Sequence, residues 1–300
     1  MTYLILANPN SGSKRGTSVV SELVTHFTAA HIDYKLFLTA KKGDETLKMK
    51  ELLAVKDEFD RVLIIGGDGT LSLAMNVLPE EMPFSYIPAG SGNDFARAMG
   101  ISKDPLTAFT KLHDHPETKD IFVIRYETAH QHGIAMNNIG IGLDAAIIEE
   151  SERGHLKKAL NTLKVGSLFY LISGLNQLFT KKAFAARVSD VANFEKAFLF
   201  TTTKHPYFGG GVTIAPDATN SKPELYLCEV DKIPKRRMFQ LLGKIVKGTQ
   251  VGDSEFHQHI AGHFEVTIDQ DEPMQIDGEL HYLTAHDTLK MTNAKRQIIF

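Results

Sequence analysis

The chain has 300 residues, of which 43% are hydrophobic and 23% charged; these fractions are typical of a globular fold of one or two domains and exclude a collagen-like or disordered chain. Its 33 basic and 36 acidic side chains give a formal net charge of −3, so we expect no nucleic-acid partner. The single cysteine, Cys228, excludes an intrachain disulfide, and we expect a core thiol in a cytoplasmic protein.

The first hundred residues alternate short aliphatic stretches with longer amphipathic ones. This pattern is typical of βα units around a parallel sheet. The predicted strands are residues 3–7, 34–38, 61–65 and 84–87. The predicted helices are residues 17–30, 44–55, 71–77 and 95–99.

From about residue 120 the chain changes to β-like segments, with one helical interruption over residues 155–180. Strands that follow a run of βα units indicate a second, mainly antiparallel domain. We therefore expect an α/β domain with a parallel sheet over residues 1–120 and a second domain over residues 121–289, with about residues 290–300 as a candidate for a return to the first. The predicted strands are residues 122–126, 133–139, 183–188, 197–202, 225–230, 264–268, 274–276 and 288–291.

The turn Gly66-Gly-Asp-Gly-Thr70 follows an apolar strand, at the position where open parallel sheets bind ligands. Its glycines let the backbone approach a phosphate closely, and Asp68 can hold Mg²⁺ or a substrate hydroxyl. A tight turn in which Asp68 only caps a helix is the alternative.

Two further loops have similar chemistry. Residues 90–97 read Gly-Ser-Gly-Asn-Asp-Phe-Ala-Arg and open a predicted helix, and residues 8–16 read Asn-Pro-Asn-Ser-Gly-Ser-Lys-Arg-Gly after the first strand. Neither the P-loop pattern nor the dinucleotide fingerprint occurs. Several phosphate-type loops on one sheet indicate a nucleotide site.

Six segments in chain order make the sequence resemble the diacylglycerol kinase catalytic domain, above all the bacterial lipid kinases, which are related to sphingosine kinases and more distantly to NAD kinases. The segments are residues 8–12, 66–70, 88–97, 138–144, 209–216 and 277–279. The resemblance spans nearly the whole chain. It implies an α/β nucleotide domain and a β-sandwich acceptor domain, with ATP and Mg²⁺ in the cleft between them and the γ-phosphate passed to a lipid hydroxyl such as that of diacylglycerol.

The resemblance also implies roles for individual residues. Asp277 of Asp-Gly-Glu matches the general base, and Asp68 and Asp120 match metal-site positions. From the residues alone, Asp277-Gly278 equally suits a β-turn and Asp120 a plain strand-edge carboxylate. The nucleotide-site positions are Asn8, Ser11, Gly12, Thr39, Gly66, Gly67, Asp68, Gly69, Thr70, Leu71, Ser72, Gly90, Ser91, Asn93 and Asp94.

One stretch departs from the family. Lys222 and Pro223 stand where its bacterial members commonly have an Asp-Gly pair that holds a structural Mg²⁺. Lys222 could replace the metal with its own charge, or Asp217 and Glu224 could form a rearranged site. The sequence leaves this open, together with two alternatives to a lipid kinase. These are a kinase for a soluble acceptor such as NAD, and a nucleotide-binding regulator without turnover.

Two basic segments are candidates for transient contact with a membrane. Residues 155–180 place lysines around a leucine stripe, and Lys235, Arg236 and Arg237 are followed by Lys244 and Lys247. Each segment either rests on an anionic bilayer or packs on the β-domain with its charges in water. We therefore expect a cytoplasmic protein, transiently membrane-peripheral, and a homodimer is possible through an exposed sheet edge.

Overall fold

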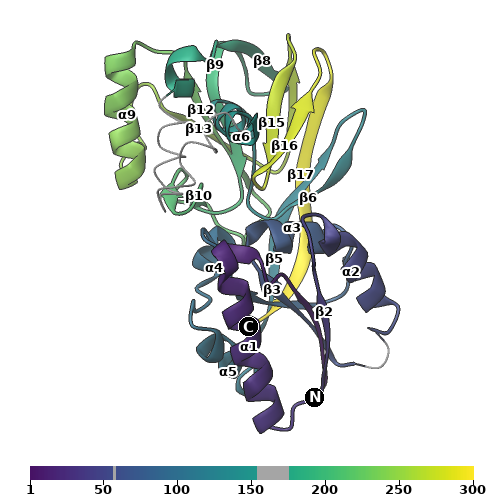
Figure 1. Ribbon diagram of the computed structural model, residues 1–300. Helices are drawn as coiled ribbons and strands as arrows, with labels where there is room; N and C mark the ends of the chain where they lie inside the picture. The colour runs from purple at the N-terminus through teal and green to yellow at the C-terminus, as the bar shows by residue number, and fades with distance from the viewer. Residues whose placement is uncertain (57–58, 154–175) are drawn as a thin grey trace.

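The computed structural model describes residues 1–56, 59–153 and 176–300 and forms two lobes joined by long strands (Figure 1). Most of the helix predicted over residues 155–180, namely residues 155–175, therefore lies outside the described residues. Among the described residues, no helix has the length and apolar character needed to cross a bilayer.

The N-terminal lobe is a parallel sheet in the order β2-β1-β3-β4, with helices on both faces. Side chains of alternate residues of β1, β3 and β4 enter two separate cores, so these strands are mostly apolar, whereas the edge strand β2 is partly exposed. All predicted strands and helices of this lobe are confirmed, and one further helix, α5, was not predicted. The elements are β1 (Tyr3–Ala7), α1 (Ser11–Ala29), β2 (Tyr34–Leu38), α2 (Asp44–Leu53), β3 (Arg61–Gly66), α3 (Asp68–Met75), β4 (Phe84–Pro88), α4 (Asp94–Met99) and α5 (Pro105–Asp114).

The C-terminal lobe is a mainly antiparallel β-sandwich with the helices α6 and α9 on its outside (Figure 1). Its elements are β5 (Thr118–Glu127), β6 (His132–Ala135), β7 (Asn138–Gly142), α6 (Leu143–Arg153), β8 (Phe184–Val188), β9 (Ala192–Thr203), β10 (Tyr207–Phe208), β11 (Val212–Thr213), β12 (Leu225–Asp231), α9 (Lys235–Lys247), β13 (His257–Ala261), β14 (Phe264–Ile268), β15 (Glu272–Ile276), β16 (Glu279–Leu283) and β17 (Thr288–Ile299).

Three features of this lobe differ from the prediction. The strand expected over residues 133–139 is two strands, β6 and β7, because the backbone between them turns its N–H groups toward the carboxylate of Asp277. The helices α6 and α9 were not predicted, and neither were the strands β10, β11, β13 and β16. Cys228 is buried in the core, as expected.

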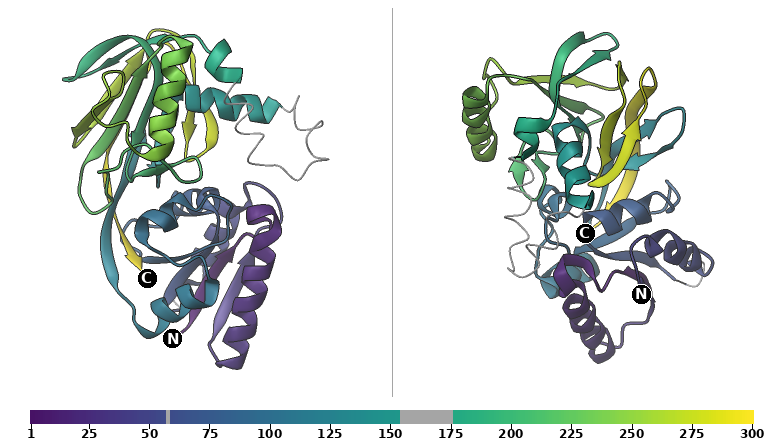
Figure 2. Two further views of the ribbon diagram at one scale, coloured as in Figure 1. Left: turned by 90° about the vertical axis from the view of Figure 1, so that its left-hand side faces the viewer. Right: turned by 45° about the horizontal axis from the view of Figure 1, so that its top comes forward.

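Two long strands join the lobes. β17 pairs with β5 along its length, with β14 near its start and with β4 at Ile298, which lies opposite Phe84. Figure 2 shows β5 and β17 passing from one lobe into the other. On this pairing we propose a division near residue 120, with the last residues of β17 belonging to the N-terminal lobe. The starts of α3 and α4 then lie beneath the second lobe.

Candidate active site

Three glycine-containing loops meet at the carboxyl ends of β1, β3 and β4. A Cβ atom on Gly90 would lie 2.5 Å from the Cα of Gly67, and one on Gly12 would lie 2.4 Å from the carbonyl oxygen of Ala89. Because both approaches are too close for any side chain, only glycine lets these backbones pack together. The loops therefore present backbone rather than side chains at this edge of the sheet.

The third of these loops is held by its own asparagine. The buried Asn93 side chain accepts a hydrogen bond from the Gly90 N–H (2.9 Å) and donates one to the Gly90 carbonyl (2.7 Å). Asn93 has a φ of +55°, a conformation that asparagine tolerates better than most residues. Of the other predicted positions, Ser91 is exposed and Leu71 is buried in the core, so Leu71 can contribute only its backbone to a ligand.

A buried carboxylate that the sequence did not reveal ties the first two loops together. Glu45, at the start of α2, accepts hydrogen bonds from the Asn8 amide (2.9 Å) and the Thr70 hydroxyl (3.2 Å). The Ser11 hydroxyl donates to the Asn8 carbonyl (2.9 Å). Asn8, Ser11 and Thr70 thus hold the shape of the loops, and an acidic residue in the first turn of a helix is too common to have pointed to this role.

Thr39 lies beside these loops with an unused hydroxyl. Its backbone N–H donates to the carbonyl of Ala7 (3.0 Å), the residue before the first loop, and its side chain is 4% exposed. The hydroxyl oxygen is buried and has no hydrogen-bond partner among the described residues. Buried polar atoms are nearly always paired, so this hydroxyl is available to a polar ligand in the adjacent loops.

Asp68 joins the second loop to the third. Its carboxylate accepts the backbone N–H groups of Asp94 and Phe95 (both 3.1 Å), so it caps α4 rather than its own helix. Burial and the nearby charges of Asp94 and Asp277 raise the pKa of Asp68 to about 6. Burial is the larger cause and the two neighbouring carboxylates add to it; a bound cation would favour the ionised form of Asp68.

Asp94 links this site to the second lobe. Its carboxylate pairs with Arg97 and accepts the backbone N–H of Gly210 (2.7 Å), in the glycine-rich turn between β10 and β11. The Arg97 guanidinium lies 5.3 Å from the centre of the Tyr207 ring. Glu279 forms another link, an ion pair with Lys42 (2.7 Å).

Asp277 starts the turn between β15 and β16, with φ values of +50° at Asp277 and +87° at Gly278. Its carboxylate accepts the backbone N–H groups of Met136 (2.6 Å), Asn137 (2.8 Å) and Asn138 (3.1 Å). The Ser72 side chain of α3 lies close enough to the same carboxylate to lower its pKa. Burial outweighs these bonds and raises the pKa of Asp277. The turn therefore positions a buried carboxylate at the junction of the lobes.

A buried polar network supports the Asp277 turn from behind. The Gln275 amide donates to the side chains of Asn138 (2.5 Å) and Asp144 (3.2 Å), and its oxygen accepts the Gly278 N–H (2.8 Å). Asp144 also accepts the Thr201 hydroxyl (2.9 Å), and burial raises the pKa of Asp144 to about 6. The network fixes the backbone on both sides of the carboxylate.

A buried histidine holds the segment that binds Asp277. His205 Nδ1 accepts the Tyr207 N–H (3.2 Å), so its Nε2 carries the proton and donates to the Asn137 side chain (2.7 Å). Burial lowers the pKa of His205 to about 3. The imidazole is therefore neutral and serves as a fixed donor.

The structure does not bring Asp120 to this site. Its carboxylate pairs with Lys295 (2.7 Å) and accepts a hydrogen bond from Gln297 (3.0 Å), with 45% of the side chain exposed. Asp120 lies opposite Gln297, next to the pairing of Ile298 with Phe84 at the amino end of β4. That end is about 13 Å from the carboxyl end of the strand, since strands rise about 3.3 Å per residue. The metal site expected from Asp68 and Asp120 together is therefore not formed by these side chains.

The loop that departs from the family is held by an internal cation. The fully buried Lys204 ammonium donates to the carbonyl oxygens of Lys222 (2.7 Å) and Glu224 and to the Asn293 side chain (2.8 Å). Burial lowers the pKa of Lys204 to about 8, which leaves it charged near neutral pH. Lys222 contributes its carbonyl, not its charge, and the Glu224 carboxylate instead accepts the Tyr226 hydroxyl (2.9 Å).

Comparison with known proteins matches both lobes. Residues 2–124 match the model of the diacylglycerol kinase catalytic domain, and residues 137–287 match that of the YegS C-terminal NAD kinase beta sandwich-like domain. A diacylglycerol kinase of Bacillus subtilis is 25% identical over 282 residues, covering 92% of this chain and 88% of the relative. One of Staphylococcus haemolyticus is 23% identical over 280 residues, covering 92% and 81%.

Solved structures share the fold. A diacylglycerol kinase from Bacillus anthracis superimposes with a TM-score of 0.74 at 21% identity, covering 100% of this chain and 96% of that chain. An NAD kinase from Archaeoglobus fulgidus, solved in complex with ATP, gives a TM-score of 0.50 at 12% identity, covering 100% and 93%.

Proposed function

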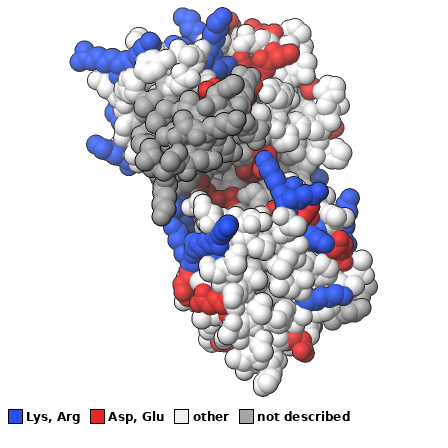
Figure 3. Space-filling model, in the orientation of Figure 1, with Lys and Arg blue, Asp and Glu red and all other residues white. Residues whose placement is uncertain are grey.

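Because the chain belongs to the diacylglycerol kinase family, we propose that it transfers the γ-phosphate of ATP to the hydroxyl of a lipid such as diacylglycerol. One observation carries the proposal. Asp277 of the second lobe lies beside α3, the helix that begins at the phosphate-type turn of Asp68, and each carboxylate is buried. A phosphoryl donor held by the loops and an acceptor from the second lobe would meet at this junction. Figure 3 shows acidic side chains in the hollow between the lobes.

Asp277 is the proposed general base. Its raised pKa favours proton uptake, and the three backbone N–H groups fix its orientation. Ser72, unlike the three backbone donors, lies beside this carboxylate with its side chain, so the hydroxyl of a lipid substrate can take its place without breaking the three backbone hydrogen bonds. A lipid hydroxyl in that position would give its proton to Asp277 as its oxygen attacks phosphorus.

The loops fit a nucleotide with Mg²⁺. The close backbone packing at Gly12, Gly67 and Gly90 leaves no room for a side chain at these three positions, and the Thr39 hydroxyl lacks a partner among the described residues. Described residues do not offer three clustered ligating side chains. Mg²⁺ is commonly held by one or two carboxylates together with phosphate oxygens and water, which suits Asp68. A cation there would offset charge on the phosphates during transfer.

α9 supports transient contact with a membrane. Phe239 and Val246 are 44% and 70% exposed, and Phe239 packs against the exposed Phe179 with ring centres 6.0 Å apart. Basic residues lie on the same exposed helix, and Figure 3 shows basic side chains at the upper left, where Figure 1 places α9. Exposed aromatic groups flanked by cations suit an anionic bilayer. The flanking residues are Lys235, Arg236, Lys244 and Lys247.

A homodimer through the sheet edge is a further part of the proposal. β13 pairs only with β12 among the described strands, and Ile260 on β13 is 54% exposed. An unpaired strand edge of this kind can pair with a second copy. Light scattering coupled to size-exclusion chromatography would report a mass near twice 33.3 kDa if it does.

The test is transfer of labelled γ-phosphate from ATP with Mg²⁺ to a panel of lipids in mixed micelles, run beside NAD and sugars. Label in one lipid class supports the proposal. Label only in NAD or a sugar would favour the soluble-acceptor alternative. ATP binding without any labelled product, across a panel that includes diacylglycerol, would favour a nucleotide-binding regulator.

A further inference from the structure

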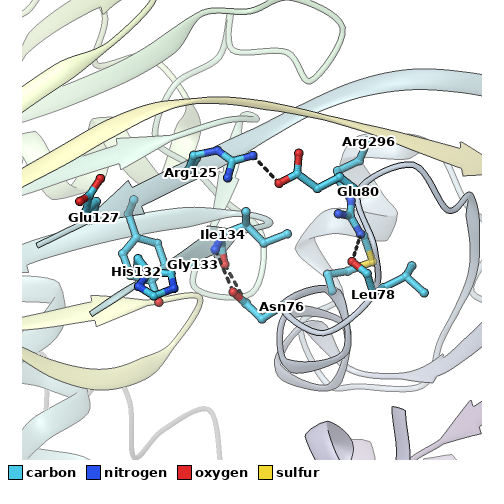
Figure 4. Close-up of a pocket in the computed structure, with 11 residues that line it drawn as sticks. Asn76, Leu78, Glu80, Arg125, Glu127, His132, Gly133, Ile134 and Arg296 are labelled. Carbon is cyan, nitrogen blue, oxygen red and sulfur yellow. Dashed lines mark hydrogen bonds and ion pairs between the residues drawn. The ribbon is translucent and has the colours of Figure 1, made fainter. Parts of the chain in front are cut away.

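A cavity of about 440 Å³ opens at the junction of the lobes, lined by residues outside the three loops (Figure 4). It lies between the end of α3 and the hairpin of β5 and β6, and β17 closes one side. None of its lining residues belongs to the nucleotide or acceptor groups described above. Its charged and titratable lining includes Arg125, His132 and Arg296 together with the carboxylates of Glu80 and Glu127.

Arg296 carries an unused buried donor. The residue is 1% exposed, and its Nη2 donates to the carbonyl of Leu78 (2.9 Å). Its Nε–H has no partner, and it forms no ion pair with any residue that the structure describes. The carboxylates of Glu80 and Glu81 act on Arg296 through their charge but do not hydrogen bond to its Nε–H, and a buried N–H without a hydrogen bond is costly unless something polar reaches it. The cavity is where such a group can bind.

A second guanidinium lies near Arg296. Arg125 of β5 pairs with Glu80, and both side chains are about half exposed at 47% and 54%. Exposed ion pairs of this kind contribute little to the stability of the folded chain, so a ligand can replace Glu80 as the partner of Arg125 at a small cost in free energy. Figure 4 shows Glu80 between Arg125 and Arg296, with His132 on the opposite side of the cavity. Two forked cations suit a phosphate group, which accepts several N–H bonds at once.

We propose that this cavity binds a phosphate monoester, with the phosphate oxygens on Arg125 and Arg296 and the organic part toward His132. A soluble phosphorylated metabolite and the headgroup of a phosphorylated lipid share this chemistry. The volume of about 440 Å³ exceeds that of a bare anion, which is why we infer an ester rather than free phosphate.

The cavity is placed to influence Asp277. The Asn76 side chain, at the end of α3, donates to the Ile134 carbonyl (2.9 Å) and accepts the Ile134 N–H (2.8 Å). Met136 lies two residues after Ile134 and donates its N–H to the Asp277 carboxylate (2.6 Å), and Ser72, one turn earlier on α3, lies beside the same carboxylate. A ligand packed between α3 and β6 would therefore stabilise the junction that orients this carboxylate. This consequence rests on the proposed function, whereas the binding itself does not.

The test is isothermal titration of glycerol 3-phosphate into the full chain without ATP or acceptor, so its outcome is independent of kinase activity. We expect saturable binding that Arg125→Gln and Arg296→Lys each weaken at least tenfold. The matched control Arg187→Gln, at an exposed position on β8, should bind like the wild type. Melting curves of each variant show whether it folds, and Arg125→Gln, at a half-exposed position, keeps the test valid if Arg296→Lys does not fold.

Further arms identify the source and exclude the nucleotide site. If the ligand is a lipid headgroup, vesicles that contain phosphatidate should bind the wild type and should bind Arg125→Gln more weakly. If the ligand is a soluble ester, the vesicles should not bind through Arg125. Once glycerol 3-phosphate has been shown to bind, either result is consistent with a phosphate site in the cavity. Binding that a non-hydrolysable ATP analogue abolishes would place the phosphate in the loops and overturn the proposal. Absence of binding, or equal binding by Arg125→Gln and Arg187→Gln, would also overturn it.

Discussion

Replacing Lys204 by methionine should destabilise the C-terminal lobe. The ammonium is fully buried and donates to two backbone carbonyls and the Asn293 side chain, which join the loop before β12 to β17. Methionine keeps the length of the side chain but leaves these acceptors without a donor. Each buried unsatisfied acceptor costs about 1–3 kcal/mol. The gain from no longer burying a charge offsets part of this cost.

We therefore expect Lys204→Met to lower the free energy of unfolding by about 3 kcal/mol, which corresponds to a fall in Tm of roughly 6–12 °C for a domain of this size. Urea titration and calorimetry measure both quantities. Lys222→Met is the matched control, because the Lys222 side chain is exposed and only its carbonyl binds Lys204; it should change stability by less than about 0.5 kcal/mol.

The same experiment separates an internal ammonium from a loop metal. If Lys204 alone supplies the cation, EDTA should leave the wild-type Tm unchanged. Equal destabilisation by Lys204→Met and Lys222→Met, or a Tm that falls with EDTA and recovers with Mg²⁺, would refute the reasoning.

Three further predictions concern acid stability, the loops and the membrane face. The pKa of His205 is about 3 in the folded chain and near 6.5 in the unfolded chain, so the unfolded chain binds more protons between these pH values. The free energy of unfolding should therefore fall by about 2 kcal/mol from pH 6.5 to pH 5. His205→Gln should reduce this pH dependence, measured by urea unfolding at each pH, and an unchanged dependence would contradict the prediction. Glu45→Ala should weaken ATP binding about tenfold in calorimetry, since Asn8 and Thr70 lose their shared acceptor. Unchanged affinity would show that the loops keep their conformation without Glu45. Lys235→Glu combined with Lys244→Glu on α9 should reduce co-sedimentation of the protein with anionic vesicles. Lys50→Glu on α2 should not reduce it. An equal loss in both variants would show that binding depends on the net charge of the protein and not on α9.

The strands β1, β3 and β4 were predictable because each is a local, mostly apolar run followed by a glycine-containing turn. α5 also had a local signal, Asp104 before Pro105, and the structure shows Asp104 capping the Thr107 N–H (2.8 Å). α9 was noticed only as a basic cluster, because its cations obscured the apolar stripe of Met238, Leu241 and Ile245. Local patterns thus predicted most of the first lobe but fewer elements of the second.

The site was predictable only in part. Asp277 was identified by a motif, yet its partners Met136, Asn137 and Asn138 lie about 140 positions earlier and act through backbone N–H groups that carry no sequence signal. Lys204 was not predicted for a related reason, since its ammonium binds the backbone carbonyls of Lys222 and Glu224, which carry no sequence signal, and the Asn293 side chain 89 positions later. Such pairings depend on the packing of strands and can be read only from the fold.

The most direct test of the central claim compares Asp277→Asn with Asp120→Asn in transfer of labelled γ-phosphate to the lipid acceptor, with ATP affinity measured in parallel. We expect Asp277→Asn to lower the rate at least about 100-fold, the usual contribution of a general base, with ATP affinity unchanged. Asp120→Asn, which alters an exposed carboxylate outside the junction, should keep the wild-type rate. Full activity of Asp277→Asn, or equal loss in both variants, would contradict the account.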